Sequence, residues 1–197
     1  MSPQETDVLE IFKRTGAYLK GHFRLTSGLH SPEYLQCALV LQHPALAERL
    51  GSALASGLRR VLGDRPVSVV ASPAIGGLII GHEVARSLGA RFVFAERDAE
   101  KQMTLRRGFT VETGAAAVVV EDVVTTGGST REVVDLLAGA GAQVLAAGSV
   151  IDRSGGTAGV GAPRVALATL QVVTYPPDDC PLCREGVPVT KPGSRKV

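Results

Sequence analysis

The sequence predicts an α/β fold, a mostly parallel sheet with helices on both faces, plus a small N-terminal hood segment. Short Val-rich runs alternate with segments of helical spacing. Parallel strands covered on both faces need such continuously apolar runs, and helices usually connect them. The chain has 197 residues, 45% hydrophobic and 20% charged, which is typical of one globular domain. We expect a single domain over residues 1–197, whose hood comes from about residues 1–40 and the C-terminal tail.

The first expected helix covers residues 6–15, where apolar residues recur at helical spacing until Gly16. Residues 21–34 mix glycine, serine and proline without a clear period, which favours an irregular, loop-rich hood. A long helix is predicted from Pro44 to Gly63, because proline is tolerated at the first helical position and leucine recurs every four residues.

The rest of the chain alternates between the two kinds of element. We expect strands over residues 67–71, 91–95, 115–120, 144–151 and 165–173, and helices over residues 78–88 and 129–138. Ligands of such sheets bind beyond the carboxyl ends of the strands, so the loops after residues 71, 95, 120 and 151 are the expected site. The Gly-rich residues 154–161 precede no helix, and we interpret them as a flexible connection.

Composition argues against several classes of protein. Aromatic residues make up only 4% and the formal net charge is +2, whereas nucleic-acid binders rely on aromatic stacking or a strong basic face. The N-terminal residues are polar and acidic, unlike a secretory signal, and no apolar run reaches the roughly 18 residues of a membrane span. We expect a cytoplasmic protein with neither a nucleic-acid partner nor a membrane partner.

Three cysteines, Cys37, Cys180 and Cys183, do not suggest a disulfide framework. A zinc site at the Cys180–Cys183 pair would need four ligands, and so groups from a partner chain or a distant loop. The histidines lie far upstream without ligand spacing: His22, His30, His43 and His82. We interpret the pair as a structural turn; a redox pair fits a Pro-rich tail even less well.

A phosphate-binding segment is predicted where the strand ending at Val120 runs into an acidic pair, a threonine-glycine loop and a helix. Glycines allow the backbone to approach a ligand, hydroxyls donate hydrogen bonds, and a helix N-terminus favours a phosphate. The acidic pair would repel a phosphate and should instead accept from ribose hydroxyls. An acidic strand end followed by an ordinary helix cap is the alternative. The segment comprises Glu121, Asp122, Val123, Val124, Thr125, Thr126, Gly127, Gly128 and Ser129.

The string VVVEDVVTTGGST resembles the phosphoribosyl pyrophosphate (PRPP) signature of the type I phosphoribosyltransferases. FRLTSGLHSPEY, ASPAIGG, MTLRRGF, VIDRSGG and TYPPDDCPLCREGVPVTKPGSR are similar to stretches of the orotate enzymes, so that the resemblance covers nearly the whole chain. It implies transfer of the phosphoribosyl group of PRPP to orotate in pyrimidine (UMP) biosynthesis, with Mg²⁺ carried by the substrate rather than by a protein metal site. By the same resemblance, Glu121 and Asp122 bind the ribose, residues 125–129 the 5′-phosphate, and Thr125 and Arg153 orotate.

Two basic features complete the expected site. Arg153 follows a strand, and its guanidinium matches a planar carboxylate; a surface arginine paired with Asp152 is the alternative. Residues 96–108 form a basic loop that could close over a pyrophosphate, unless they are only a solvated hairpin tip. The resemblance implies that this loop reaches the neighbouring subunit of a homodimer, with Arg97 and Lys101 joining Asp122 as catalytic residues.

The turn at residues 71–77 could hold the pyrophosphate through free N–H groups. Thr26 and Gly76 stand where some relatives carry lysines, so other groups would have to supply those contacts. Two other functions remain open: a purine phosphoribosyltransferase, and a non-catalytic regulator that senses PRPP.

Overall fold

The α/β architecture is confirmed in the computed structural model, which describes residues 3–25 and 27–192. The main sheet has six strands in the order β5-β4-β3-β6-β7-β8. All neighbouring strands are parallel except the β4–β5 pair. The strands are β3 (Val69–Pro73), β4 (Arg91–Arg97), β5 (Met103–Leu105), β6 (Ala116–Val124), β7 (Gln143–Asp152) and β8 (Arg164–Thr169).

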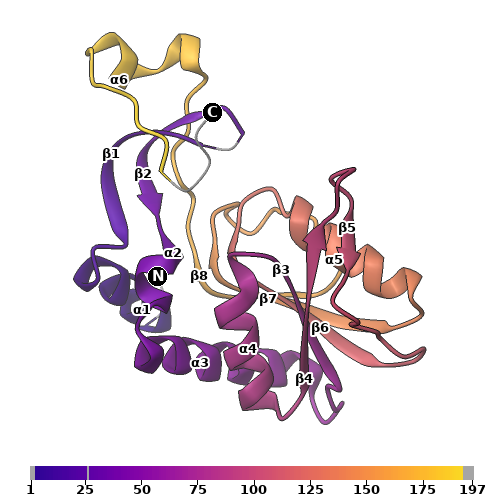
Figure 1. Cartoon of the computed structure of the whole chain (residues 1–197). Coiled ribbons are helices and arrows are strands. Elements are labelled where there is room, and N and C mark those ends of the chain that lie inside the picture. Colours follow the sequence, from indigo (N-terminus) through magenta and orange to yellow (C-terminus); the bar gives the residue numbers. More distant parts are fainter. Residues whose placement is uncertain (1–2, 26, 193–197) are drawn as a thin grey trace.

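Helices cover both faces of this sheet, as predicted. On one face lie α1 (Pro3–Arg14), α3 (Pro44–Leu62) and α4 (Gly77–Leu88), with the short α2 (Cys37–Leu41), whereas α5 (Gly128–Gly139) covers the other (Figure 1). Strand β6 alternates between the two cores: Val118 and Val120 pack in the first cluster, and Ala117 and Val119 in the second. A strand buried on both sides explains the continuous apolar run.

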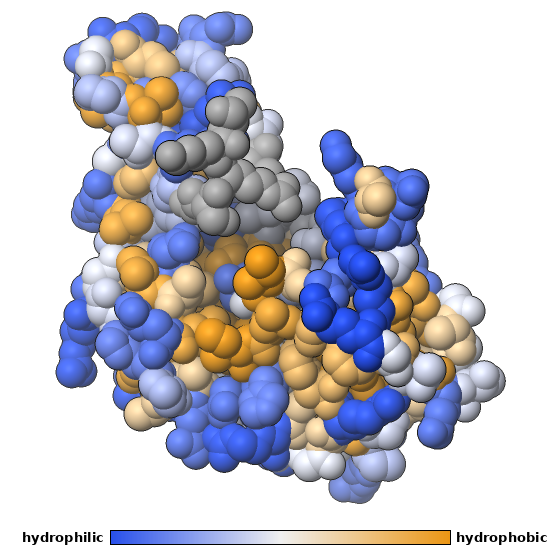
Figure 2. Space-filling view, viewed as in Figure 1, coloured by the Kyte–Doolittle hydropathy of each residue, from blue (hydrophilic) through white to orange (hydrophobic). Residues whose placement is uncertain are grey.

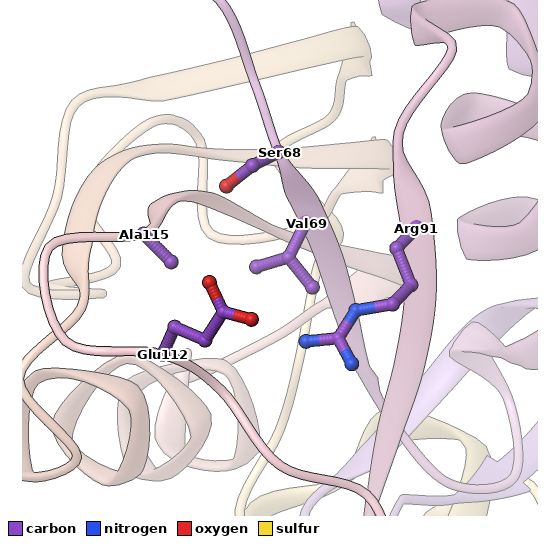
Figure 3. A pocket seen from close by; sticks show the side chains of 5 residues that line it. All are labelled: Ser68, Val69, Arg91, Glu112 and Ala115. Carbon is purple, nitrogen blue, oxygen red and sulfur yellow. The ribbon is translucent and has the colours of Figure 1, made fainter.

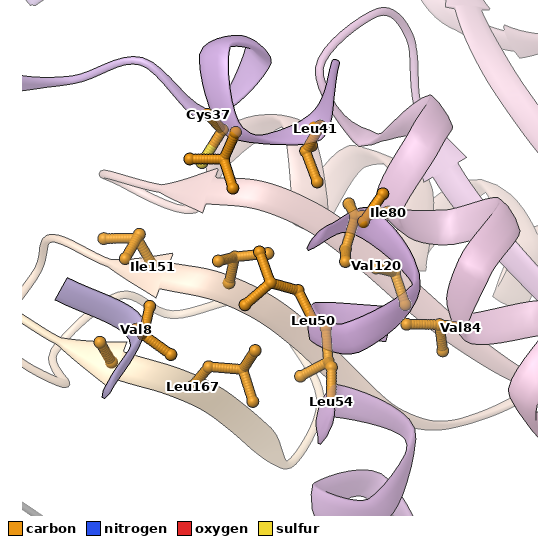
Figure 4. Close-up of a cluster of buried hydrophobic side chains, with 14 of the residues drawn as sticks. Val8, Cys37, Leu41, Leu50, Leu54, Ile80, Val84, Val120, Ile151 and Leu167 are labelled. Carbon is orange, nitrogen blue, oxygen red and sulfur yellow. The ribbon is translucent and has the colours of Figure 1, made fainter. Parts of the chain in front are cut away.

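The long helix α3 supplies much of the first core. It begins with Pro44 at its first position and ends before Gly63, whose φ of 62° suits glycine. Leu50 and Leu54 project from it into the buried cluster that also holds Ile80 of α4, Val120 of β6 and Ile151 of β7 (Figure 4). Within the described residues, no helix is both long and apolar enough to cross a membrane.

The prediction of an irregular hood was wrong. Strands β1 (Tyr18–Arg24) and β2 (His30–Leu35) form an antiparallel hairpin, closed by a hydrogen bond from Leu25 N–H to the Leu29 carbonyl. A register shift between Lys20 and Phe23 breaks the two-residue period, so the sequence pattern hides the strands. Thr26, where some relatives carry a lysine, lies outside the described residues.

The C-terminal tail returns to this hairpin through η1 (Pro177–Asp179) and α6 (Pro181–Arg184) and lies beside β1 and β2, away from the main sheet (Figure 1). The strand expected over residues 165–173 already ends at Thr169. The turn expected at Cys180–Cys183 is the single helical turn of α6. Although the chain spacing placed the histidines out of reach, the fold brings His22 and His30 to the two cysteines.

Candidate active site

The acidic pair lies on the carboxyl end of β6, which continues past Val120 because β7 pairs along it as far as Val124. Glu121 is buried, with 6% of its surface exposed, and its Oε2 accepts a 3.3 Å hydrogen bond from Ser129 Oγ. Asp122 Oδ1 accepts from the N–H of Val123 at 2.8 Å. The strand therefore holds both carboxylates rigidly at the sheet edge.

Burial destabilises the ionised forms of both carboxyl groups. It raises the pKa of Glu121 well above its ordinary value, and the charge of neighbouring Asp122 raises it further. The pKa of Asp122 is also raised by burial, although the hydrogen bond from Val123 N–H opposes the rise. Two buried carboxylates are most stable as anions when a ligand donates hydrogen bonds to them, as the vicinal hydroxyls of a sugar do.

The loop that we expect to bind an anion leads into the start of α5. Gly127 has φ 82°, and a Cβ there would lie 2.9 Å from Cγ1 of Val160, so both conformation and space require glycine. The N–H of Arg131 closes the first helical turn onto the Gly127 carbonyl. The N–H groups before it have no carbonyl one turn back, and with the exposed Thr125 and Thr126 they offer donors to a phosphate.

The segment that follows β7 supports this loop from behind. Asp152 is buried; its Oδ1 accepts from the N–H and the Oγ of Ser154, and its Oδ2 lies 3.3 Å from Nη1 of Arg164. Ser154 Oγ in turn accepts from the N–H of Thr157 and of Ala158. The residues interpreted as a flexible connection are thus tied by hydrogen bonds, and Val160 packs on Gly127.

Arg153 is half-buried at the same edge and is not a surface residue paired with Asp152, so that alternative is wrong. Its backbone N–H donates to the Val124 carbonyl at 2.8 Å, which joins the ends of β7 and β6. Its Nε is fully buried and has no hydrogen-bond partner among the described residues. Burial lowers the pKa of Arg153, while nearby Tyr34 and Glu33 of β2 oppose that change. A buried, unsatisfied guanidinium nitrogen favours an anionic ligand.

The turn between β3 and α4 packs directly on the acidic pair. A Cβ built on Gly76 would lie 2.7 Å from Oδ1 of Asp122, and one on Gly77 would lie 2.9 Å from the Val120 carbonyl oxygen. Both distances are shorter than real contacts allow, so the glycines permit the close approach. A side chain at position 76 would require either the Asp122 carboxylate or this turn to move.

The basic residues lie on the β4–β5 hairpin. Strand β4 is parallel to β3, so it ends at the same edge as the acidic pair. Arg97 is ion-paired with Glu132 of α5 at 2.9 Å, and exposed Lys101 sits at the tip with φ 64°. Among the described residues, neither side chain forms a hydrogen bond or ion pair with Glu121 or Asp122. The hairpin is present, but it is not closed over the site.

Comparison with known proteins identifies the family. Residues 39–174 match the phosphoribosyl transferase domain. The orotate phosphoribosyltransferase of Pelotomaculum thermopropionicum is 53% identical over 191 residues, which cover 97% of this chain and 98% of the relative. This chain belongs to the orotate phosphoribosyltransferase family. The orotate phosphoribosyltransferase of Heliobacterium modesticaldum is 51% identical over 97% of this chain and 98% of its own length.

Solved structures agree with this assignment at the level of the fold. The orotate phosphoribosyltransferase of Aeropyrum pernix superimposes with a TM-score of 0.67 and 26% identity, covering 83% of this chain and 94% of that chain. The adenine phosphoribosyltransferase of Saccharomyces cerevisiae reaches 0.65 at 17% identity, covering 81% and 99%. Because enzymes for two different bases share the fold, the fold alone does not distinguish the orotate family from its adenine counterpart.

Sequence reasoning missed two residues that lie close to this candidate site. Tyr34 of β2 is close enough to Arg153 and Asp122 for both charges to affect its pKa, which burial raises. The thiol of Cys37 lies 3.8 Å from the Asp122 carbonyl oxygen, and burial raises its pKa well above the usual value. Both come from the hood side of the chain, and no local pattern pairs them with β6.

One pocket lies at the opposite edge of the sheet. Ser68, Val69, Arg91, Glu112 and Ala115 line a hollow at the amino ends of β3 and β4 (Figure 3). Arg91 is already engaged there, since its Nη2 donates to the Thr110 carbonyl at 2.6 Å. This hollow is therefore separate from the acidic pair and from Arg153.

Proposed function

We propose that this chain carries out the reaction of its family, transfer of the phosphoribosyl group of PRPP to orotate, which gives orotidine 5′-monophosphate and pyrophosphate in pyrimidine biosynthesis. Family membership supports the activity. The observation that carries the choice of acceptor is the buried, unpartnered Nε of Arg153 beside the ribose site. We place the reaction in the cytoplasm, in one domain over residues 1–197.

PRPP is bound at the carboxyl end of β6 in this proposal. Glu121 and Asp122 accept hydrogen bonds from the ribose hydroxyls, which meets the cost of their burial. The 5′-phosphate lies on the N–H groups and hydroxyls of residues 125–129 at the start of α5. The N–H groups of the turn at Gly76 and Gly77 face the pyrophosphate, because this turn packs on Asp122.

Orotate is bound between the donor site and the hood. Its carboxylate pairs with Arg153, and Thr125 adds a hydroxyl contact. Adenine and hypoxanthine carry no carboxylate, so either base would leave the buried Nε of Arg153 without a partner. Discrimination against purines follows, because a site built for a charged partner rejects a ligand that lacks it.

The chemistry requires positioning rather than a protein nucleophile. Orotate N1 attacks C1 of the ribose and pyrophosphate leaves, with inversion at C1; the chain holds both reactants in line and excludes water. Glu121 and Asp122 offer a pair of carboxylates rather than a full cage of oxygen ligands, which fits a metal ion that arrives on the substrate. Mg²⁺ bound in this way neutralises charge on the leaving pyrophosphate.

We also propose a homodimer in which the β4–β5 hairpin of one subunit completes the site of the other. Arg97 is held by Glu132 of its own subunit, whereas Lys101 extends from the exposed tip and can reach outward. Mixing tests this sharing. Lys101→Ala and Asp122→Asn subunits, each impaired alone, should regain activity at about a quarter of all sites when their dimers exchange at random. If confirmed heterodimers recover no activity, the hairpin of one subunit does not complete the site of the other.

The reaction itself is tested by incubating the protein with Mg²⁺, PRPP and one base at a time. We expect loss of the ultraviolet absorbance of orotate and stoichiometric release of pyrophosphate. Consumption of adenine or hypoxanthine, but not of orotate, would establish the purine alternative. PRPP binding without turnover of any base would establish the regulator.

A further inference from the structure

Four side chains that this activity does not use converge in the hood. They are His22 on β1, His30 on β2, Cys180 just before α6, and Cys183 on α6. Each residue offers one possible ligand atom, and these four atoms all lie within 4.8 Å of one another. His22, His30 and Cys180 are buried, and Cys183 is exposed. The cluster joins segments about 158 residues apart in the chain.

The distances match the edges of a tetrahedral metal site. Bond lengths of about 2.0 Å to nitrogen and 2.3 Å to sulfur give ligand separations of about 3.3 Å for N–N, 3.5 Å for N–S and 3.8 Å for S–S. His22 Nε2 lies 2.9 Å from His30 Nδ1, 3.5 Å from Cys180 Sγ and 3.8 Å from Cys183 Sγ. Cys183 Sγ lies 3.3 Å from His30 Nδ1.

A backbone carbonyl orients His22 for this role. The Nδ1 of His22 lies 2.7 Å from the carbonyl oxygen of Val187, which can only accept, so Nδ1 carries the proton. In the neutral ring, Nε2 then presents a single lone pair to three polar neighbours at once. One lone pair accepts one good hydrogen bond, whereas one cation satisfies all four ligands. Metal-bound histidines commonly donate their other N–H to a carbonyl in this way.

The hood lacks a hydrophobic core of its own that could otherwise explain the cluster. Phe23 and Cys180 are the only buried hydrophobic residues of the described chain that belong to neither core cluster. Within the part of the tail and hairpin that the structure describes, main-chain hydrogen bonds join the two at only two places, Tyr175 with His30 and Thr190 with His22 and Arg24. Small units with so little apolar burial usually need a metal or a disulfide.

We propose that His22, His30, Cys180 and Cys183 bind a structural zinc ion that fastens the C-terminal tail to the β1–β2 hairpin. Two thiolates and two imidazoles form a closed tetrahedral set that suits zinc and leaves no position for a substrate. The site is separate from the acidic pair. It acts on the reaction only by holding β2, whose Tyr34 lies near Arg153.

The metal content of the full-length protein tests this proposal independently of its activity. Protein made in zinc-supplemented medium should retain one zinc ion per chain after dialysis against a weak chelator. Exchange with Co²⁺ should give the absorption of a tetrahedral cobalt site together with thiolate charge-transfer bands. Cys183 is exposed, so Cys183→Ser costs little packing; it should lose the metal and the charge-transfer intensity while remaining folded.

The control is His43→Asn, which removes an exposed histidine outside the cluster and should keep the full metal content. Cys183→His offers a second variant, because it preserves a ligand: it should retain zinc but show weaker charge transfer than the parent protein. Zinc that Cys183→Ser retains as well as the parent would be adventitious and would overturn the site. A metal-free protein whose Cys180 and Cys183 titrate as a disulfide would overturn it too.

Discussion

Gly76 lies against the carboxylate of Asp122, so that a Cβ on Gly76 would come 2.7 Å from Oδ1 and 2.9 Å from Oδ2. The backbone of Gly76, with φ −58° and ψ −41°, is ordinary helical geometry that any residue can adopt. The close approach of Asp122, and not the backbone conformation, therefore favours glycine here. This contact fixes the Asp122 carboxylate relative to the turn that we propose to face the pyrophosphate.

Gly76→Ala should displace Asp122 and lower kcat/KM by roughly 100-fold, since a shift of about 1 Å at a reacting geometry costs that much. Steady-state kinetics with PRPP as the varied substrate measures the loss. Gly139→Ala is the matched control, because a Cβ there meets nothing within 4 Å and the residue ends a helix. Equal kinetics for the two variants would refute the steric explanation.

Glu121→Gln should stabilise the ligand-free protein in a pH-dependent manner. The folded state raises the pKa of Glu121, so as the pH rises above the ordinary value of 4.5 the unfolded chain ionises first and stability falls. Glutamine does not ionise, and the variant should therefore melt higher than the parent at neutral pH but not at pH below that value. Thermal melting across pH tests this, with the exposed Glu100→Gln as control. A pH-independent difference would contradict it.

Arg153→Met should raise KM for orotate by roughly 30-fold, since losing one partner of a desolvated ion pair costs at least about 2 kcal/mol. The Kd for PRPP should hardly change, because Arg153 contributes to the acceptor side. Initial rates and direct PRPP titration separate the two effects. Arg49→Met removes an exposed arginine paired with Asp7 and should leave both constants unchanged. Equal weakening of both substrates by Arg153→Met would show that the acceptor role is wrong.

Lys101→Ala should lower kcat by roughly 100-fold while the Kd for PRPP changes little, because a charge that meets the leaving group acts in the transition state. Near-normal turnover would show that Lys101 takes no part in the mechanism.

Glu132→Gln offers the opposite change: it weakens the 2.9 Å ion pair that holds Arg97 and frees the hairpin to move. Its kcat should not fall. A loss as large as that of Lys101→Ala would show that the ion pair itself is needed.

The sequence predicted correctly those elements whose determining residues all lie in one continuous segment. Helix α3 was predicted to within a residue because its leucine spacing, Pro44 and Gly63 all lie in one stretch. The positions of the acidic pair at the end of β6 and of the threonine-glycine loop before α5 were likewise predictable, since strand, loop and helix follow directly along the chain. The β1–β2 hairpin was missed because a register shift interrupts its period.

Contacts between distant segments could not be predicted in this way. Tyr34 lies near enough to Arg153 to affect its pKa only because the fold brings β2 close to the end of β7. His22 likewise lies beside Cys180, from which 158 residues separate it in the chain. The spacing of the cysteines alone therefore did not reveal that two histidines lie beside them. Two of the four clustered side chains come from strands whose existence the pattern did not reveal.

Asp152 has a consequence for how the two substrates are held. Its buried carboxylate fixes Ser154 and Arg164, and through them the segment in which Val160 packs on Gly127, while the next residue along the chain is Arg153. One anchor thus supports both the loop before α5 and the backbone at Arg153, which are the two halves of the proposed site. Asp152→Asn should weaken this anchor and leave the segment less ordered. Each substrate must then pay a larger entropy cost to order it on binding, so the affinities for the phosphoribosyl donor and for the carboxylate acceptor should decline together.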